Sequence, residues 1–191
     1  MSGVDTTIGE RFGQALTILG PSGCRLSDEQ IAAVDEVPRI TVARSLLFAE
    51  AFAIHEERLS RRPQAIDPNV RASLERGRMM SSADLVRLLR ARARLVAGMD
   101  IVAREFDALI MPTTKIVAPL LTESTTPEGF AAKTPLLAGN TSLVNFLDLC
   151  AISLPIPRAG GLPVGLMLVG RNGHDRRLLR IASAVERLFA A

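Results

Sequence analysis

The stretch NTSLVNFLDLCAISLPIP, which runs from Asn140 to Pro157, sets small polar residues directly before an apolar segment. Its last part, CAISLPIP, is a short apolar run that ends in proline, which is typical of a buried β-strand. The polar residues at its start must therefore lie close to the core. They either satisfy backbone hydrogen-bonding groups or contribute to a site.

The sequence on both sides of this stretch predicts two more strands. AGGLPVGLMLVG contains a turn followed by the apolar run Val164–Val169, and its distance from CAISLPIP fits a β-hairpin. Upstream, DALIMPTT (Asp107–Thr114) is an apolar run that ends at a proline. The segment from Lys115 to Gly139, rich in Pro, Thr, Ser and Gly, is predicted to be an irregular surface excursion.

An amphipathic helix is predicted to close the chain. Asp175 lies in its first turn, where a negative charge is favourable. The residues expected to face the core are Leu178, Leu179, Ile181, Ala182, Val185 and Leu188.

The first half of the chain reads mainly as helix. Helices are predicted over residues 8–19, ended by Gly20, and from Asn69 to Arg76, where Gly77 ends or bends the helix. Between them, Cys24–Leu26 fits a short strand, whereas Ser27 and Gln30 fit the capping box of a short helix. A stronger helical run begins at Pro38, with an apolar side formed by Ile40, Ala43, Leu46, Leu47, Phe48, Ala51 and Ile54.

A long helix follows Ser81–Ser82, one of which is a good N-cap, and runs to about Phe106. Its arginines, at positions 87, 90, 92 and 94, lie mostly off the apolar stripe and are predicted to form a solvated face rather than a nucleic-acid site. The chain is thus expected to be one partial domain over residues 1–191. It is mainly helical over 1–106, and strands with a closing helix make up 107–191.

The composition excludes several classes of function. Of the 191 residues, 48% are hydrophobic and 23% charged, and the net charge of +3 forms no basic run, so a globular protein that does not bind nucleic acid directly is expected. Two widely separated cysteines indicate a reduced, cytoplasmic protein. The N-terminal residues do not resemble a signal peptide, and no stretch is long and apolar enough to span a membrane.

Motif searches indicate neither a cofactor nor a metal. The sequence contains no G-x-G-x-x-G, no phosphate-binding G-x-x-x-x-G-K-[ST], no G-x-S-x-G and no H-E-x-x-H. Two histidines, His55 and His174, are too few for a His-rich metal site. They are predicted to lie on a helix surface and at a turn or helix cap, respectively.

An ordered series of short motifs resembles the carboxy-terminal part of the amidase signature family, which includes bacterial amidases, allophanate hydrolases and the amidase subunit of tRNA-dependent amidotransferases. The resemblance covers roughly residues 8–191. The motifs are Glu50-Ala51 with His55, Asp67–Arg71, Asp107–Thr113, Asn145–Pro155 and Gly161–Gly170.

The resemblance implies an α/β fold, in which several amphipathic helices pack on a few strands of a mixed sheet, and hydrolysis of carboxamide C–N bonds. Two positions depart from the family, which usually has Gly and Pro where this chain has Asp148 and Cys150. Cys150 is expected to be a small core residue. The family's nucleophilic Ser, second Ser and Lys lie in an upstream Gly/Ser-rich stretch that nothing here matches. We therefore expect no catalytic residue in this chain.

A serine nucleophile needs a base within hydrogen-bonding reach and donors that stabilise the oxyanion, so the chain is predicted to be inactive alone. It would act on a small amide substrate only when an upstream segment completes it. The alternative is a non-catalytic remnant that binds an amidase-like chain or a second copy of itself.

By the same resemblance, the stretches Pro112–Lys115 and Gly139–Asn145 would approach the substrate. The candidate substrate-binding residues are Thr113, Thr114, Thr141, Ser142 and Asn145. The competing interpretation is that the threonines and the serine cap loops and helices, and that Asn145 and Asp148 brace the strand that contains Ser153.

Overall fold

The computed structural model describes residues 3–42, 45–157 and 160–190. It divides the chain into two compact units, one formed by Met1–Ile31 with Val96–Ala191 and the other by Ala32–Leu95. Each unit is described by itself.

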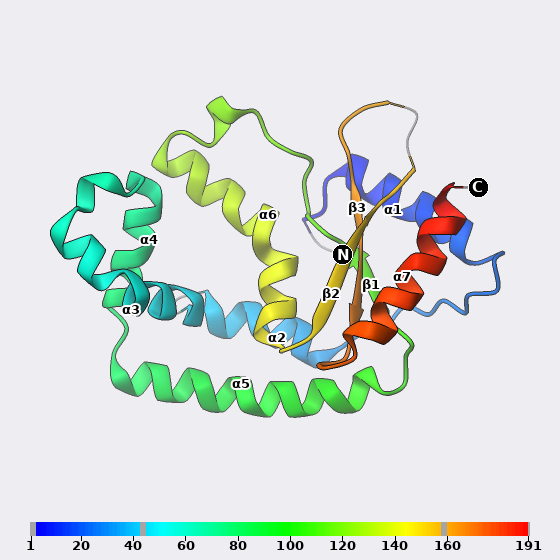
Figure 1. The fold of residues 1–191 in the computed structure, drawn as a ribbon, viewed down its shortest axis with the longest axis horizontal. Helices are drawn as coiled ribbons and strands as arrows, with labels where there is room; N and C mark the ends of the chain where they lie inside the picture. Colours follow the sequence, from blue (N-terminus) through cyan, green and yellow to red (C-terminus); the bar gives the residue numbers. More distant parts are fainter. Residues whose placement is uncertain (1–2, 43–44, 158–159, 191) are drawn as a thin grey trace. The chain divides into compact units, whose positions relative to one another are not determined.

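The first unit is built on a three-stranded antiparallel sheet (Figure 1). Its strands are β1 (Leu109–Pro112), β2 (Cys150–Pro155) and β3 (Gly165–Gly170), in the order β1-β3-β2. The predicted strands and the hairpin of β2 with β3 are therefore confirmed, and so is the α/β class. The pairing among these described strands is antiparallel throughout, so they do not show the parallel pairs of a mixed sheet.

Helices α1 (Thr6–Leu19) and α7 (Asp175–Ala190) cover one face of this sheet (Figure 1). Leu166 and Leu168 of β3 point to this side and are buried with Ile8 of α1 and Leu178 of α7. Each such side chain contributes about 1.5–3 kcal/mol by leaving water. Leu179, predicted to face the core, is 55% exposed, because it lies one residue past Leu178 and so points about 100° away.

Helix α6 (Pro127–Phe146) covers the other face, where Val144 packs against Met167 and Val169 of β3. The prediction that the whole segment from Lys115 to Gly139 is irregular was wrong. Only its first part is irregular, apart from the short 3-10 helix η2 (Leu121–Glu123).

Pro135, one of the prolines of this segment, lies inside α6. It leaves the carbonyl of Ala131 without its usual donor, but Ala131 is exposed and water can serve as the donor. The helix begins where the Thr126 hydroxyl accepts a hydrogen bond from the backbone N–H of Gly129, at 3.1 Å.

The second unit contains α2 (Ala32–Thr41), α3 (Leu46–Arg61), the 3-10 helix η1 (Pro63–Ala65), α4 (Pro68–Arg78) and the first part of α5 (Ser82–Ala103). The helix predicted to begin at Pro38 is corrected: α2 begins earlier and includes Pro38, and a separate helix starts at Leu46. Ala43 of the predicted apolar side lies outside the described residues. Neither alternative for Cys24–Gln30 forms, since residues 24–31 adopt no helix or strand.

Two N-caps explain where α4 and α5 begin. The Asp67 carboxylate accepts hydrogen bonds from the backbone N–H groups of Asn69 and Val70, at 2.9 and 3.2 Å. The Ser81 hydroxyl accepts from the N–H of Asp84 and donates to its carboxylate, which confirms the predicted cap. Helix α5 ends at Ala103, three residues before the predicted Phe106.

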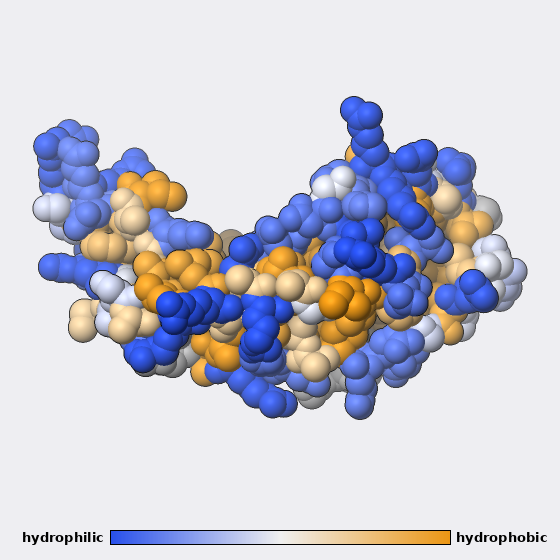
Figure 2. Space-filling view, turned by 90° about the horizontal axis from the view of Figure 1, so that it is seen from below, coloured by the Kyte–Doolittle hydropathy of each residue, from blue (hydrophilic) through white to orange (hydrophobic). Residues whose placement is uncertain are grey.

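Three of the four arginines of α5 face water, as predicted for a solvated helix face, whereas Arg92 is half-buried. Arg87, Arg90 and Arg94 are exposed, and Arg94 pairs with Glu36 of the same unit. The face of the molecule seen in Figure 2 is largely hydrophilic (blue), with hydrophobic residues (orange) between the hydrophilic ones. The exposed large apolar residues of the second unit are Val42, Leu47, Ile54, Val70, Met79, Val86 and Leu89.

Gly77 does not end α4, which continues to Arg78. It is buried, and a Cβ atom added there would lie 2.0 Å from the backbone oxygen of Phe48 in α3. A glycine at this position lets the two helix backbones come close together.

We predict that Gly77→Ala destabilises the chain by about 1–3 kcal/mol, because α3 and α4 must separate to admit the methyl group. Gly98→Ala is the matched control, since Gly98 is also helical but has open space around it. It should be neutral or stabilising by about 0.5–1 kcal/mol. Urea unfolding followed by circular dichroism measures both. Equal free energies of unfolding for the two variants would contradict the close packing at Gly77.

Candidate functional site

A pair of hydroxyl groups lies at the end of the sheet where β1 finishes and β3 begins. Thr113 follows β1, and its Oγ1 atom is 2.5 Å from the Oγ atom of Ser153 in β2. The backbone N–H of Thr113 donates to the carbonyl of Gly165 at 2.9 Å, which extends the β1–β3 pairing by one residue. Thr113 is half-buried and Ser153 is exposed.

Gly165 makes this pair possible. Strands β1 and β2 are not neighbours, because β3 runs between them. A Cβ atom at Gly165 would lie 2.4 Å from the Ser153 hydroxyl oxygen and 2.6 Å from that of Thr113. The two side chains therefore meet in the space that a side chain at Gly165 would fill.

Helix α6 brings a third polar group to this end of the sheet. The Asn140 side-chain amide donates to the backbone oxygen of Pro112 at 2.7 Å. Pro112 is the last residue of β1 and is fully buried. This bond links the middle of α6 to the strand end that carries Thr113.

The predicted site residues form two groups on the α6 side of the sheet. Thr113 and Thr114 follow β1, whereas Thr141, Ser142 and Asn145 lie in α6 rather than in a loop. The Thr114 hydroxyl donates to the Ile116 carbonyl, and that of Thr141 to the Ala138 carbonyl, which fits the local capping interpretation.

The bond from Asn140 to Pro112 brings together the chain segments that contain Thr113 and Thr141. Ser142 and Asn145 are exposed. Their contact with a substrate stays a prediction, as it does for the three threonines.

Sequence reasoning did not include Asn140, Ser153 or Gly165 among the candidates. Ser153 is the only hydroxyl in the apolar strand CAISLP, which is the one local signal of a special position. Its partner Thr113 is 40 residues away, and Asn140 is 28 residues from Pro112. Contacts at such separations leave no periodic pattern in the sequence.

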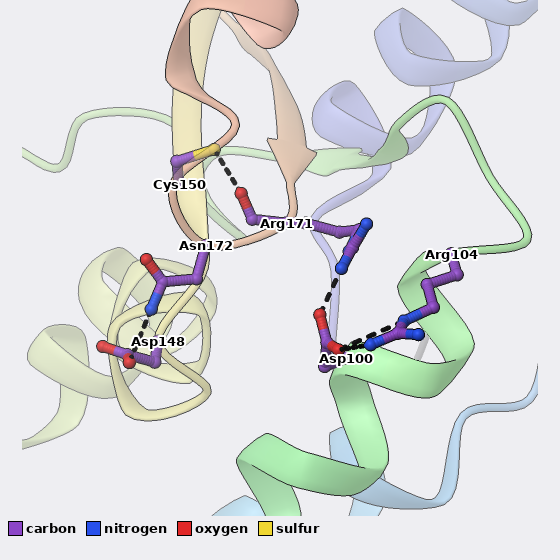
Figure 3. A network of polar contacts seen from close by, with 6 residues as sticks. All are labelled: Asp100, Arg104, Asp148, Cys150, Arg171 and Asn172. Carbon is purple, nitrogen blue, oxygen red and sulfur yellow. Dashed lines mark hydrogen bonds and ion pairs between the residues drawn. The ribbon is translucent and has the colours of Figure 1, made fainter.

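A second polar network lies at the opposite end of β3, in the turn to α7 (Figure 3). The Asp100 carboxylate of α5 accepts hydrogen bonds from Arg104, at 2.7 Å, and from Arg171, at 3.0 Å. The Asn172 side chain donates to Asp148 at 2.8 Å. These contacts fasten the turn after β3 to α5 and to the turn between α6 and β2.

Asp148 has a positive φ of 59°, a conformation that Asp tolerates better than most residues. Its hydrogen bond from Asn172 braces the turn between α6 and β2 and the turn after β3. Asp148 is therefore not directed at the hydroxyl pair.

A small pocket of about 50 Å³ adjoins this network, between the end of α5 and the start of α7. Arg104, Arg171 and His174 line it, together with the ion pair of Arg177 with Asp107. Because Asp100 and Asp107 already pair with the three arginines, the pocket is explained as part of the structural network.

The pKa of Asp100 is lowered, chiefly by the hydrogen bond from Arg104 and then by that from Arg171. A carboxyl group with a lowered folded-state pKa stabilises the fold above its unfolded pKa of about 3.9 and loses that contribution as the pH falls through the folded value.

We predict that Asp100→Asn lowers the melting temperature near pH 7 and that its difference from the unsubstituted chain shrinks at acidic pH. Melting curves from pH 7 down to about pH 2.5 measure this. Asp28→Asn is the control, because Asp28 is exposed and lies outside helices and strands. A difference that stayed constant over this pH range would contradict an ionic role for Asp100.

Burial raises the pKa of the Cys150 thiol, and the nearby Asp175 carboxylate raises it further. The thiol donates to the carbonyl of Arg171, with 3.1 Å between sulfur and oxygen (Figure 3). Cys150 is the first residue of β2 and packs, half-buried, against the core, as expected for a small core residue. Cys24, by contrast, is exposed, and both cysteines are free.

We predict that iodoacetamide alkylates Cys150 at least about tenfold more slowly than Cys24 at pH 8, because the thiolate is the reactive form. The variants Cys24→Ser and Cys150→Ser isolate each thiol, and mass spectrometry follows the reaction. In urea the two rates should become similar. Fast alkylation of Cys150 in the folded chain would contradict its protected position.

Within residues 3–42, 45–157 and 160–190, no group of three or more His, Cys, Asp or Glu side chains is placed to hold a metal ion. No helix in the described part of the chain has the length and apolar character needed to cross a membrane.

The chain has an α/β fold in which helices cover both faces of a sheet. Hydroxyl and amide groups lie at one end of that sheet. The sequence model of the Amidase family matches residues 2–179, which is most of the sequence. The chain therefore belongs to the amidase family.

Three known proteins illustrate the similarity. The 2-amino-5-chloromuconic acid deaminase of Comamonas testosteroni is 26% identical over 187 residues, which cover 97% of this chain and 40% of the deaminase. The fatty acid amide hydrolase of Oryza sativa subsp. indica is 33% identical over 123 residues, which cover 63% of this chain and 20% of that hydrolase.

The solved structure of a serine-to-alanine variant of the Kluyveromyces lactis allophanate hydrolase has the same fold, with a TM-score of 0.83 at 21% identity. The match covers 97% of this chain and 30% of that one. The chain thus spans less than half the length of each of these three relatives.

Proposed function

We propose that this chain is the carboxy-terminal part of an amidase-family enzyme that hydrolyses carboxamide C–N bonds. It would supply one partial domain over residues 1–191. The observation that carries the proposal is the family match over residues 2–179, together with relatives that are far longer than the matched part. The chemistry is consistent with two of the relatives, which are named as hydrolases of fatty acid amides and of allophanate.

We further propose that the chain does not hydrolyse amides alone. A serine becomes a nucleophile when a base removes its proton and donors stabilise the oxyanion. In the described part of the chain, the Ser153 hydroxyl contacts another hydroxyl, and Ser81 serves as a helix cap. Of the two lysines, Lys133 pairs its ammonium group with the Glu123 carboxylate at 3.6 Å.

In the completed enzyme, Thr113, Thr114, Thr141, Ser142 and Asn145 are proposed to form part of the substrate wall. Supporting this proposal, all five lie on the α6 side of the sheet or follow its first strand. A cytoplasmic location is also proposed, in keeping with two free cysteines.

We predict that the purified chain releases no ammonia from benzamide and that activity appears when a polypeptide carrying the family's Ser-Ser-Lys segment is co-expressed with it. Replacing the nucleophilic serine of that polypeptide by alanine should return the rate to background, because such a loss costs on the order of a millionfold. Ammonia release is the measurement. Turnover by the chain alone, unaffected by the added polypeptide, would contradict the proposal that this chain does not hydrolyse amides without a catalytic segment supplied by another polypeptide.

The alternative is a non-catalytic chain that assembles with an amidase-like partner or with itself. The exposed apolar residues of the second unit, such as Leu47, Ile54 and Met79, favour this candidate. Light scattering of the purified chain tests the self-association part of this alternative, because a 20.5 kDa monomer would count against it.

A further inference from the structure

Asn172 is the only asparagine of the sequence that precedes a glycine. The residues that follow the four asparagines are Val70, Thr141, Phe146 and Gly173. Asparagine is chemically labile because the backbone nitrogen of the next residue can attack the carbon of its side-chain amide. A Cβ atom on that next residue obstructs the attack, and glycine has none. The pair Asn172-Gly173 therefore offers this reaction the least steric resistance in the chain.

The structure places the pair at the surface, in the turn between β3 and α7. The backbone N–H of His174 donates to the carbonyl of Arg171 at 3.0 Å, which puts Asn172 and Gly173 at the two central positions of the turn. Both residues are exposed, and a Cβ atom added at Gly173 would meet open space. Solvent, which must remove the proton from the attacking nitrogen, therefore reaches the pair.

The other three asparagines lie in helices. Asn140 and Asn145 are part of α6, where the helical pattern engages the N–H group of the following residue. Asn69 lies in the first turn of α4, and the N–H of Val70 after it donates to the Asp67 carboxylate at 3.2 Å. Because these nitrogens are held in hydrogen bonds, the three positions serve as internal comparisons for Asn172.

Asn172 also forms a link between two turns. Its side-chain amide donates to the carboxylate of Asp148 at 2.8 Å (Figure 3). Asp148 lies between α6 and β2, so the bond fastens the turn after β3 to the turn before β2. The bond needs an N–H donor on residue 172, and deamidation removes that donor.

We propose that Asn172 is a site of spontaneous deamidation, and that the products disconnect the turn after β3 from the turn between α6 and β2. The backbone nitrogen of Gly173 loses its proton to solvent and attacks the Cγ atom of Asn172. The bond from Cγ to Nδ2 breaks, and the amide nitrogen leaves as ammonia. Water then opens the cyclic imide at either carbonyl. The net change is the exchange of ammonia for water, and it leaves aspartate or isoaspartate at this position.

Both products place a second carboxylate beside that of Asp148. Like charges so close together repel, although solvent reduces the effect at an exposed site. Isoaspartate also routes the backbone through Cβ and Cγ, which lengthens the chain within the turn that the bond from His174 to Arg171 closes. The link is therefore lost in both products, and the turn itself is strained in isoaspartate.

The first test is to incubate the purified chain in mildly alkaline buffer and to follow each asparagine by peptide mapping with mass spectrometry. We expect conversion at Asn172 to be at least about tenfold faster than at Asn69, Asn140 or Asn145, because Gly173 lacks the obstructing Cβ. Asn172→Gln is the matched control. It keeps the amide, but attack would have to close a larger ring, so conversion at this position should cease.

The second test measures the consequence with variants. Asn172→Asp, which has the side chain of one product, should lower the melting temperature near neutral pH by about 2–4 °C. Adding Asp148→Asn exchanges the amide and the carboxylate between the two positions and should restore most of this loss. Asparagine tolerates the positive φ of 59° at residue 148, so the exchange fits the backbone. Asp148→Asn alone completes the double-mutant cycle.

The inference is overturned if Asn172 is converted no faster than the other three asparagines, or if Asn172→Asp melts like the unsubstituted chain. Additive losses in the double variant would also overturn it, because the two side chains would then not interact. The outcome is independent of the proposed function. Deamidation releases at most one ammonia per chain from this position and does not need benzamide, so it is distinguishable from amide turnover.

Discussion

The two-sided burial of β3 is the constraint on which the rest of the first unit depends. Leu166 and Leu168 point to α1 and α7, while Met167 and Val169 point to α6, and all four are almost completely buried. A strand that is apolar on both faces is stable only when helices cover both sides. In the order β1-β3-β2 this strand is also central, so both of its edges are paired with neighbouring strands.

Glycines at both ends of β3 allow other groups to come close, and the two ends differ in chemistry. At Gly165 the neighbours are the hydroxyls of Thr113 and Ser153. At Gly170 an added Cβ would lie 3.1 Å from the Cys150 sulfur and 3.4 Å from Leu178. The second end is closed by packing and by the bonds of Arg171 and Asn172, so its polar groups are paired with each other. At the first end, the hydroxyls of Thr113 and Ser153 contact each other rather than a charged group.

The sequence was most informative where local rules decide the structure. The three strands, α1, α7 and the Ser81 cap follow from apolar runs, helical spacing and a side chain that reaches nearby N–H groups. Proline was misleading twice. Pro38 indicated the start of a helix, and the proline-rich composition of residues 115–139 indicated an irregular segment, yet Pro38 and Pro135 each lie inside a helix. Gly77 indicated the end or a bend of a helix, whereas it serves the close approach of α3 and α4. The role of Gly77 depends on the tertiary contact between α3 and α4. The tolerance of Pro135 depends on water that can serve the exposed carbonyl of Ala131.

The candidate site shows the same limit. Thr113 could be selected from the sequence because it directly follows an apolar strand. Ser153 and Gly165 could not, since their importance arises only when β1 and β2 flank β3 in register. A residue that matters because it is small, such as Gly165, is recognisable only once the groups that fill its space are known.

Family membership and local geometry are consistent with the proposed place of Thr113 in the substrate wall of the completed enzyme. A hydroxyl that contacts another hydroxyl gains no base, because neither partner accepts a proton readily at neutral pH. The same contact fixes the orientation of both side chains and so reduces the entropy lost when a ligand binds. Orientation without activation is what a substrate wall provides, and it leaves the bond-breaking step to a serine whose proton can be removed by a neighbouring base.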